Sequence, residues 1–212
     1  MPLFIDPLDS WLDLLGTTSL LAAYWIYVNL VSKTPSSGKA SLNRSIGYFY
    51  LAVGIYALSS GLWALATWPF PSSYNLIFSD AWPIFGVALI ILGLFNLTYT
   101  AEAQGEGEQL RLRGALVGIA ALSLIPLIYG VDIWVYGLTN EPALAGLMFF
   151  SIGLAGVLSP ALTLKSVGKS MAYLLMFLLV VAGIIALLIG VEAIFIHTAA
   201  WRTWAPWYGT SK

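Results

Sequence analysis

The chain has 212 residues, of which 59% are hydrophobic and 9% are charged, whereas an average soluble domain has roughly 25% charged residues. So few charges cannot cover a water-exposed surface, and a net charge of −1 provides no basic face for nucleic acid. The absence of cysteine excludes disulfides, thiolate metal sites and thiol catalysis. The composition therefore predicts an integral membrane protein whose surroundings are the lipid bilayer, with no nucleic-acid partner.

Six apolar segments follow one another, each near the roughly 20 residues that cross a hydrocarbon core. They must be helical, because lipid offers no hydrogen-bond partner to the backbone. We place them at 11–32, 45–67, 81–99, 114–132, 142–164 and 170–195. Residues 1–10 contain no Lys or Arg and so lack the basic region of a signal peptide, which makes the first segment a retained helix. The prediction is an all-α, single six-helix transmembrane domain over residues 1–212, in which 196–212 forms an aromatic tail at the membrane interface.

Basic residues predict the orientation of this bundle. Seven of the nine Lys and Arg residues lie after the first, third and fifth segments, and the remaining two, Arg202 and Lys212, lie in the tail. Because positively charged loops stay in the cytoplasm, both termini are predicted to be extracellular, in the cell membrane. The seven residues are Lys33, Lys39, Arg44, Arg111, Arg113, Lys165 and Lys169.

Tryptophans are frequent at the predicted extracellular helix ends. An indole there can bury its ring and keep its N–H in water, so these residues are interpreted as an aromatic belt at the membrane interface. They are Trp11, Trp68, Trp82, Trp134, Trp201, Trp204 and Trp207.

Glycines recur every seven residues in four of the segments, which places each set on one helix face. Small residues on one face let helices approach closely in lipid, so the pattern predicts a bundle closely packed through glycine stripes. Short similarities between helix ends also predict three tandem hairpins, made of the first and second, third and fourth, and fifth and sixth helices. The stripes are Gly47, Gly54 and Gly61, then Gly86 and Gly93, then Gly146 and Gly153, and finally Gly183 and Gly190.

Acidic residues and the single histidine gather at the predicted extracellular side. Asp132, Glu141, Glu192 and His197 are the candidate metal ligands, because carboxylates with an imidazole suit Zn²⁺ or a similar divalent ion. Glu192 and His197 are five residues apart, about 140° around a helix, which argues against a shared ligand face. The alternative is structural: the carboxylates cap helices or form ion pairs, as Glu192 would with Arg202, and His197 is interfacial. No other cofactor is predicted.

Three segments are the basis of a family resemblance, TWPFPSSYNLIFSD (67–80), SIGLAGVLSP (151–160) and GVEAIFIHTAAW (190–201). They resemble DUF981, an archaeal family of multi-pass membrane proteins of unknown function. The resemblance implies an archaeal membrane protein and supplies no activity, cofactor or catalytic residue. It also implies an extracellular loop in which Tyr74, Asn75 and Asp80, together with Pro69 and Pro71, are the residues to examine for ligand contact.

Catalytic motifs are missing from the sequence. There is no G-x-S-x-G, no H-E-x-x-H and no phosphate-binding loop. None of the predicted helices has a charge near its middle, which argues against a proton-coupled transporter. We therefore expect a structural or accessory subunit of a membrane complex or homo-oligomer rather than an enzyme. The alternative is a small transporter, channel or receptor with an acidic and histidine-containing cation or metal site on its extracellular side.

Overall fold

The computed structural model describes residues 7–98, 106–166 and 168–199, and these residues form an all-α bundle without strands. Six helices, with three short helical segments beside them, are long and apolar enough to cross a membrane, as predicted. The helices are α1 (Pro7–Ile26), α2 (Ser36–Thr67), α3 (Asp80–Leu97), α4 (Glu106–Tyr136), α5 (Pro142–Leu158) and α6 (Gly168–Ala199), and the short segments are η1 (Tyr27–Val31), η2 (Asn75–Ser79) and η3 (Ser159–Thr163).

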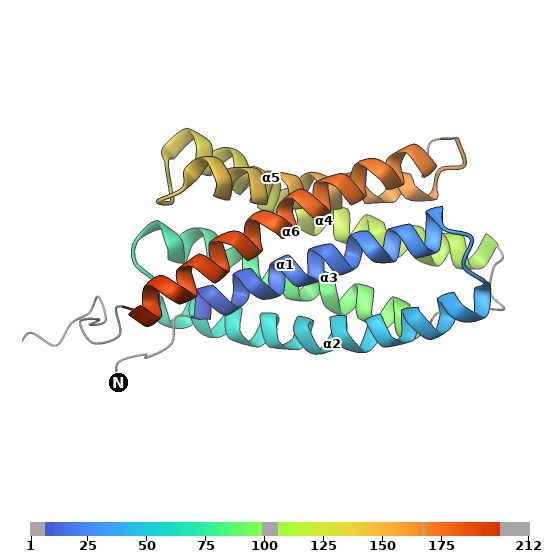
Figure 1. Cartoon of the computed structure of the whole chain (residues 1–212), viewed down its shortest axis with the longest axis horizontal. Coiled ribbons are helices and arrows are strands. Elements are labelled where there is room, and N and C mark those ends of the chain that lie inside the picture. Colours follow the sequence, from blue (N-terminus) through green and yellow to red (C-terminus); the bar gives the residue numbers. More distant parts are fainter. Residues whose placement is uncertain (1–6, 99–105, 167, 200–212) are drawn as a thin grey trace, which may run out of the picture.

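The two ends of the bundle differ in charge. At one end, here called the termini end, α1, α3 and α5 begin and α2, α4 and α6 finish (Figure 1). The seven basic residues that follow the odd-numbered helices all lie in segments of the opposite end, whereas Arg202 and Lys212 lie outside the described residues. Among the described residues, the termini end therefore carries no Lys or Arg.

Several helices extend beyond the apolar spans that the sequence predicted. α2 and α6 each have 32 residues, which at 1.5 Å per residue is about 48 Å and exceeds the roughly 30 Å of a hydrocarbon core. Residues 36–44 of α2 and 106–113 of α4 contain basic residues and were expected to be loops. Hydropathy detects only the part of a helix that lipid surrounds, so helical turns in the headgroup region escape it. The predicted tail lies outside the described residues from residue 200 onward.

The helices associate as three close pairs, which are α2 with α3, α4 with α5, and α1 with α6. The tandem hairpins expected from the sequence are not the closest pairs. Instead, the first and last helices of the chain lie side by side along most of their length (Figure 1). The bundle is thereby closed by a contact between segments that are farthest apart in the sequence.

Glycine backbones form the contact between α2 and α3. A Cβ atom placed on Gly54 would lie 2.9 Å from the carbonyl oxygen of Gly86, and one on Gly86 would lie 2.8 Å from the carbonyl oxygen of Gly54. Gly47 and Gly93 face one another in the same way, with both distances 3.1 Å. The distances at Gly54 and Gly86 are shorter than real Cβ contacts, and those at Gly47 and Gly93 are shorter than almost all of them. The two helices can therefore approach this closely only because all four positions lack a side chain.

The other two helix pairs also approach closely at glycines. A Cβ on Gly183 of α6 would lie 3.0 Å from the carbonyl oxygen of Gly16 of α1, and a Cβ on Gly190 would lie 2.6 Å from a carboxylate oxygen of Asp13. Between α4 and α5, a Cβ on Gly153 would lie 2.6 Å from the Cα of Leu127. Close packing through glycine stripes, predicted from the seven-residue spacing, is confirmed.

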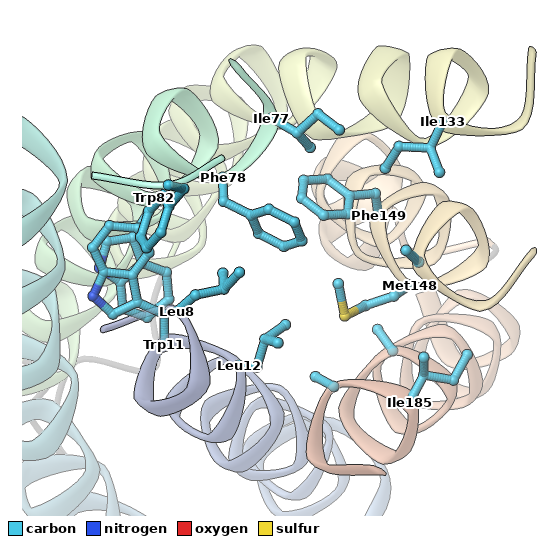
Figure 2. Packing of buried hydrophobic residues seen from close by; sticks show 14 of the residues in the cluster. Leu8, Trp11, Leu12, Ile77, Phe78, Trp82, Ile133, Met148, Phe149 and Ile185 are labelled. Carbon is cyan, nitrogen blue, oxygen red and sulfur yellow. The ribbon is translucent and has the colours of Figure 1, made fainter. Parts of the chain in front are cut away.

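An aromatic cluster fills the core near the termini end (Figure 2). Trp11 and Trp82 stack with ring centroids 5.1 Å apart, and Phe70 meets Trp11 edge-on at 5.3 Å. Trp82 donates its indole N–H to the hydroxyl of Ser60 at 3.0 Å. Both tryptophans are almost fully buried, so the interpretation of Trp11 and Trp82 as members of an interface belt is wrong. Hydropathy cannot tell which face of a helix end turns toward its neighbours.

Substituting Gly54 by Ala should destabilise the bundle, because the new methyl group meets backbone and side-chain atoms of α3 at 2.9 Å. Overpacking of this kind costs about 1–3 kcal/mol. Thermal unfolding of the purified protein in lipid nanodiscs measures the loss. Gly114→Ala is the matched control, since a Cβ at Gly114 of α4 meets nothing within 4 Å. That variant should be neutral or slightly more stable, because Ala favours helix over Gly. Equal melting of the two variants would contradict the role of the stripe.

Candidate functional site

A cavity of about 420 Å³ opens at the termini end of the bundle. Its walls come from the first turn of α1, the loop before η2, the loop between α4 and α5, and the last turns of α6. Leu12, Phe78 and Met148 contribute to an apolar floor. The polar residues of the rim include Asp9, Tyr74, Asn140, Glu141, Glu192 and His197.

Asp9 and His197 link the first helix to the last at the edge of this cavity. Nδ1 of His197 lies 2.8 Å from the Oδ2 atom of Asp9, a distance at which the imidazole N–H donates to the carboxylate. The residue Asp9 is 7% exposed, so its carboxylate is held in place by the helices around it. Asp9 was not predicted as a site residue. The two residues are 188 positions apart, and only the pairing of α1 with α6 brings them together.

Three of the four predicted metal-site residues line the cavity, namely Glu141, Glu192 and His197. Glu192 and His197 both do so although they are five residues apart on α6. Asp132 is not among the lining residues and lies within α4. In the part of the chain that the structure describes, no three His, Asp or Glu side chains gather closely enough to hold a metal ion. The divalent metal stays a prediction.

Of the three residues predicted in the ligand-facing loop, one lines the cavity and two do not. Tyr74 lines the cavity, and its hydroxyl accepts a hydrogen bond from the backbone N–H of Asn140 at 3.0 Å. Asn75 is buried and holds the backbone of Phe70, accepting from its N–H at 2.9 Å and donating to its carbonyl oxygen. Asp80 accepts a hydrogen bond from the hydroxyl of Tyr129 at 2.6 Å.

Two loops are tied together to form one wall of the cavity. In addition to the bond between Tyr74 and Asn140, the hydroxyl of Ser73 donates to the carbonyl oxygen of Leu138 at 2.6 Å. The Asn75 side chain fixes the shape of the loop from which Ser73 and Tyr74 project. These contacts join the connection before α3 to the connection before α5, so the wall depends on two hairpin connections that are distant in sequence.

The charges around the cavity favour a positively charged ligand. Asp9, Glu141 and Glu192 contribute three carboxylates, against the single imidazole of His197. Glu141 and Glu192 are exposed, and neither forms an ion pair with a described residue. Since no described Lys or Arg lies at this end, the local field is negative and attracts cations.

Comparison with known proteins identifies a family and nothing more specific. Residues 1–200 match the profile of DUF981, described as a protein of unknown function. No curated protein and no solved structure matches the chain. The resemblance found in the sequence is confirmed, whereas the archaeal origin stays a prediction.

Substituting Asn75 by Ala should remove two hydrogen bonds to the Phe70 backbone and leave buried backbone groups without a partner. A loss of about 1–3 kcal/mol in the free energy of unfolding is expected. Asn140→Ala is the matched control, because Asn140 is exposed and it is its backbone N–H that bonds to Tyr74. Thermal unfolding in nanodiscs compares the two variants. If Asn140→Ala lowered the melting temperature as much as Asn75→Ala, the hydrogen bonds of Asn75 to the Phe70 backbone would not be what holds this loop.

Proposed function

We propose that this chain, which belongs to the DUF981 family of proteins of unknown function, is a membrane protein that binds a small organic cation in the termini-end cavity. The observation that carries the proposal is the cavity itself, which brings Asp9, Glu141 and Glu192 together at an end of the bundle without described basic residues. This corresponds to the receptor or transporter alternative among the expectations from the sequence.

The size and lining of the cavity favour an organic cation over a bare metal ion. Zinc needs ligands that converge to about 2 Å from the ion, and the described carboxylates and imidazole do not gather in that way. A volume of about 420 Å³ leaves room for a molecule of many atoms, since about 10–15 Å³ of cavity volume on this measure suffices for one water. Phe70, Tyr74 and Phe78 supply aromatic rings, which attract ammonium groups.

We further propose that the cavity faces the extracellular side. The seven described Lys and Arg residues lie at the opposite end of the bundle, and such residues remain in the cytoplasm when a membrane protein is inserted. A ligand would then reach the cavity from outside the cell, as suits a receptor or an uptake carrier.

A role as an accessory subunit also stays a prediction. Glycine stripes would favour it if they were free, because they can form contacts between chains as well as within one. In the described residues, Gly54 and Gly86 face one another, and Gly183 faces Gly16, all inside the same chain. These positions are therefore not free to contact a partner, and the cavity is the stronger guide to function.

Binding of choline tests the proposal, because 3,3-dimethylbutan-1-ol has the same shape without the charge. Isothermal titration of the protein in nanodiscs should give binding of choline that is at least about tenfold tighter than that of the neutral alcohol, a difference of about 1.4 kcal/mol. The double variant Glu141→Gln/Glu192→Gln should lose about tenfold or more in affinity, since the attraction between unit charges 4 Å apart is about 1–4 kcal/mol near a protein surface.

Glu108→Gln is the matched control for that experiment. Glu108 lies at the opposite end of the bundle, where it pairs with Arg111 at 2.9 Å, and its substitution should leave choline binding unchanged. Equal affinity for choline and the alcohol, or binding that survives the double substitution, would count against a cation site at this cavity. The same titration with Zn²⁺ examines the metal alternative.

The orientation can be tested by single cysteines, because the natural chain contains none. Asn140→Cys places a thiol at the termini end and Ser37→Cys places one at the opposite end, both at exposed positions. In intact cells, a membrane-impermeant maleimide should label Cys at position 140 and should label position 37 only after permeabilisation. The reverse labelling would show that the cavity faces the cytoplasm.

A further inference from the structure

A second cavity, of about 130 Å³, lies within the bundle, and all six long helices contribute to its lining. A smaller cavity of about 80 Å³ adjoins it. The two share Phe85, Ala88, Ser123 and Ile152 as lining residues. Both are surrounded mainly by apolar side chains, and neither includes the carboxylates of the termini end. The smaller cavity shares Leu12 and Phe78 with the termini-end cavity, whereas the larger one shares no lining residue with it and is distinct from the proposed cation site.

Two hydroxyl groups at this interior space are unused by the fold. Tyr50 lines the larger cavity and is 1% exposed, yet its hydroxyl makes no hydrogen bond to a described residue. Ser123 lines both cavities and is only partly buried, and no hydrogen bond joins its hydroxyl to a described residue. Thr18 and Ser19, on the same larger cavity, donate to the carbonyl oxygens of their own helix four residues earlier. Burying a polar group without a partner costs about 1–3 kcal/mol, so an orphaned hydroxyl calls for a partner.

The volume indicates what kind of partner fits. An engineered apolar cavity of about 150 Å³ in another protein stays dry and binds benzene, whereas a buried water needs two to four polar partners. The larger cavity here has a similar volume and the adjoining one adds to it. A ring of six atoms would fill apolar space that water would not, and a hydrogen-bond acceptor on that ring would satisfy a hydroxyl.

We propose that the interior cavity binds a neutral, lipid-soluble molecule with a single ring and a carbonyl group, whose oxygen accepts a hydrogen bond from Tyr50 or Ser123. The ring packs against Ala88 and Ile152, where the two cavities meet. The proposal does not depend on the cation site, because the residues that carry it lie elsewhere in the bundle.

Two probes of nearly equal size test the proposal, 4-fluorobenzaldehyde with a carbonyl and 4-fluorotoluene without one. Their binding to the full chain in nanodiscs is measured by ¹⁹F NMR, and partition into empty nanodiscs is subtracted. Both should bind, and the aldehyde should bind about 3- to 10-fold tighter, which is the effect of one neutral hydrogen bond. If neither probe binds to protein-containing nanodiscs more than to empty nanodiscs, the proposal is overturned.

Five variants distinguish the contribution of the hydrogen bond from that of the cavity space. Tyr50→Phe and Ser123→Ala, singly and together, remove the hydroxyls; the double variant should bind both probes with equal affinity. Ala88→Leu fills the space between the two cavities and should reduce the binding of both probes at least tenfold. Ala52→Leu is the same substitution at an exposed position of α2 and should change nothing. Thermal unfolding confirms that each variant is folded.

A preference for the aldehyde that persists in the double hydroxyl variant would overturn the assignment of Tyr50 and Ser123. Equal loss of binding in Ala52→Leu and Ala88→Leu would likewise place the probes outside the interior cavity.

Discussion

Backbone contact between helices is the constraint on which the rest of this structure depends. In lipid there is little hydrophobic drive to bring apolar helices together, so van der Waals contact must supply the attraction. Here it does so where Gly54 meets Gly86, and where Gly16 meets Gly183, with no side chain between the helices. Three close pairs result, and the spaces left between the pairs are where the cavities lie.

Closure of the bundle by α1 and α6 has a direct consequence for the candidate site. It brings Asp9 of the first helix to His197 of the last, and it sets both beside Glu192 at the cavity. The opposite wall is made by loops that hydrogen bonds of Ser73 and Tyr74 hold together. The cavity thus exists only in the assembled bundle, because no single hairpin contains its walls.

Polar groups are distributed unevenly through the molecule. The described basic side chains lie at one end and the cavity carboxylates at the other. The buried polar side chains of the interior are mainly hydroxyls and asparagine amides, as the expense of burying an ion in lipid requires. Most of these hydroxyls bond to their own helix, as Thr18 and Ser19 do. Those of Tyr50 and Ser123 do not, which makes them the polar groups around the interior cavity that the fold leaves available.

The amino-acid sequence by itself determined the class of this protein, the number of its helices, the family and the glycine faces, because each depends on composition or on a local period. It also pointed to Glu141, Glu192, His197 and Tyr74, which all line the cavity. Only the tertiary structure decided that α1 pairs with α6, that Asp9 joins His197, and that Trp11 and Trp82 turn inward rather than toward the interface. The physical reason is that every face of a transmembrane helix is apolar, so hydropathy cannot tell a face that meets lipid from a face that meets another helix.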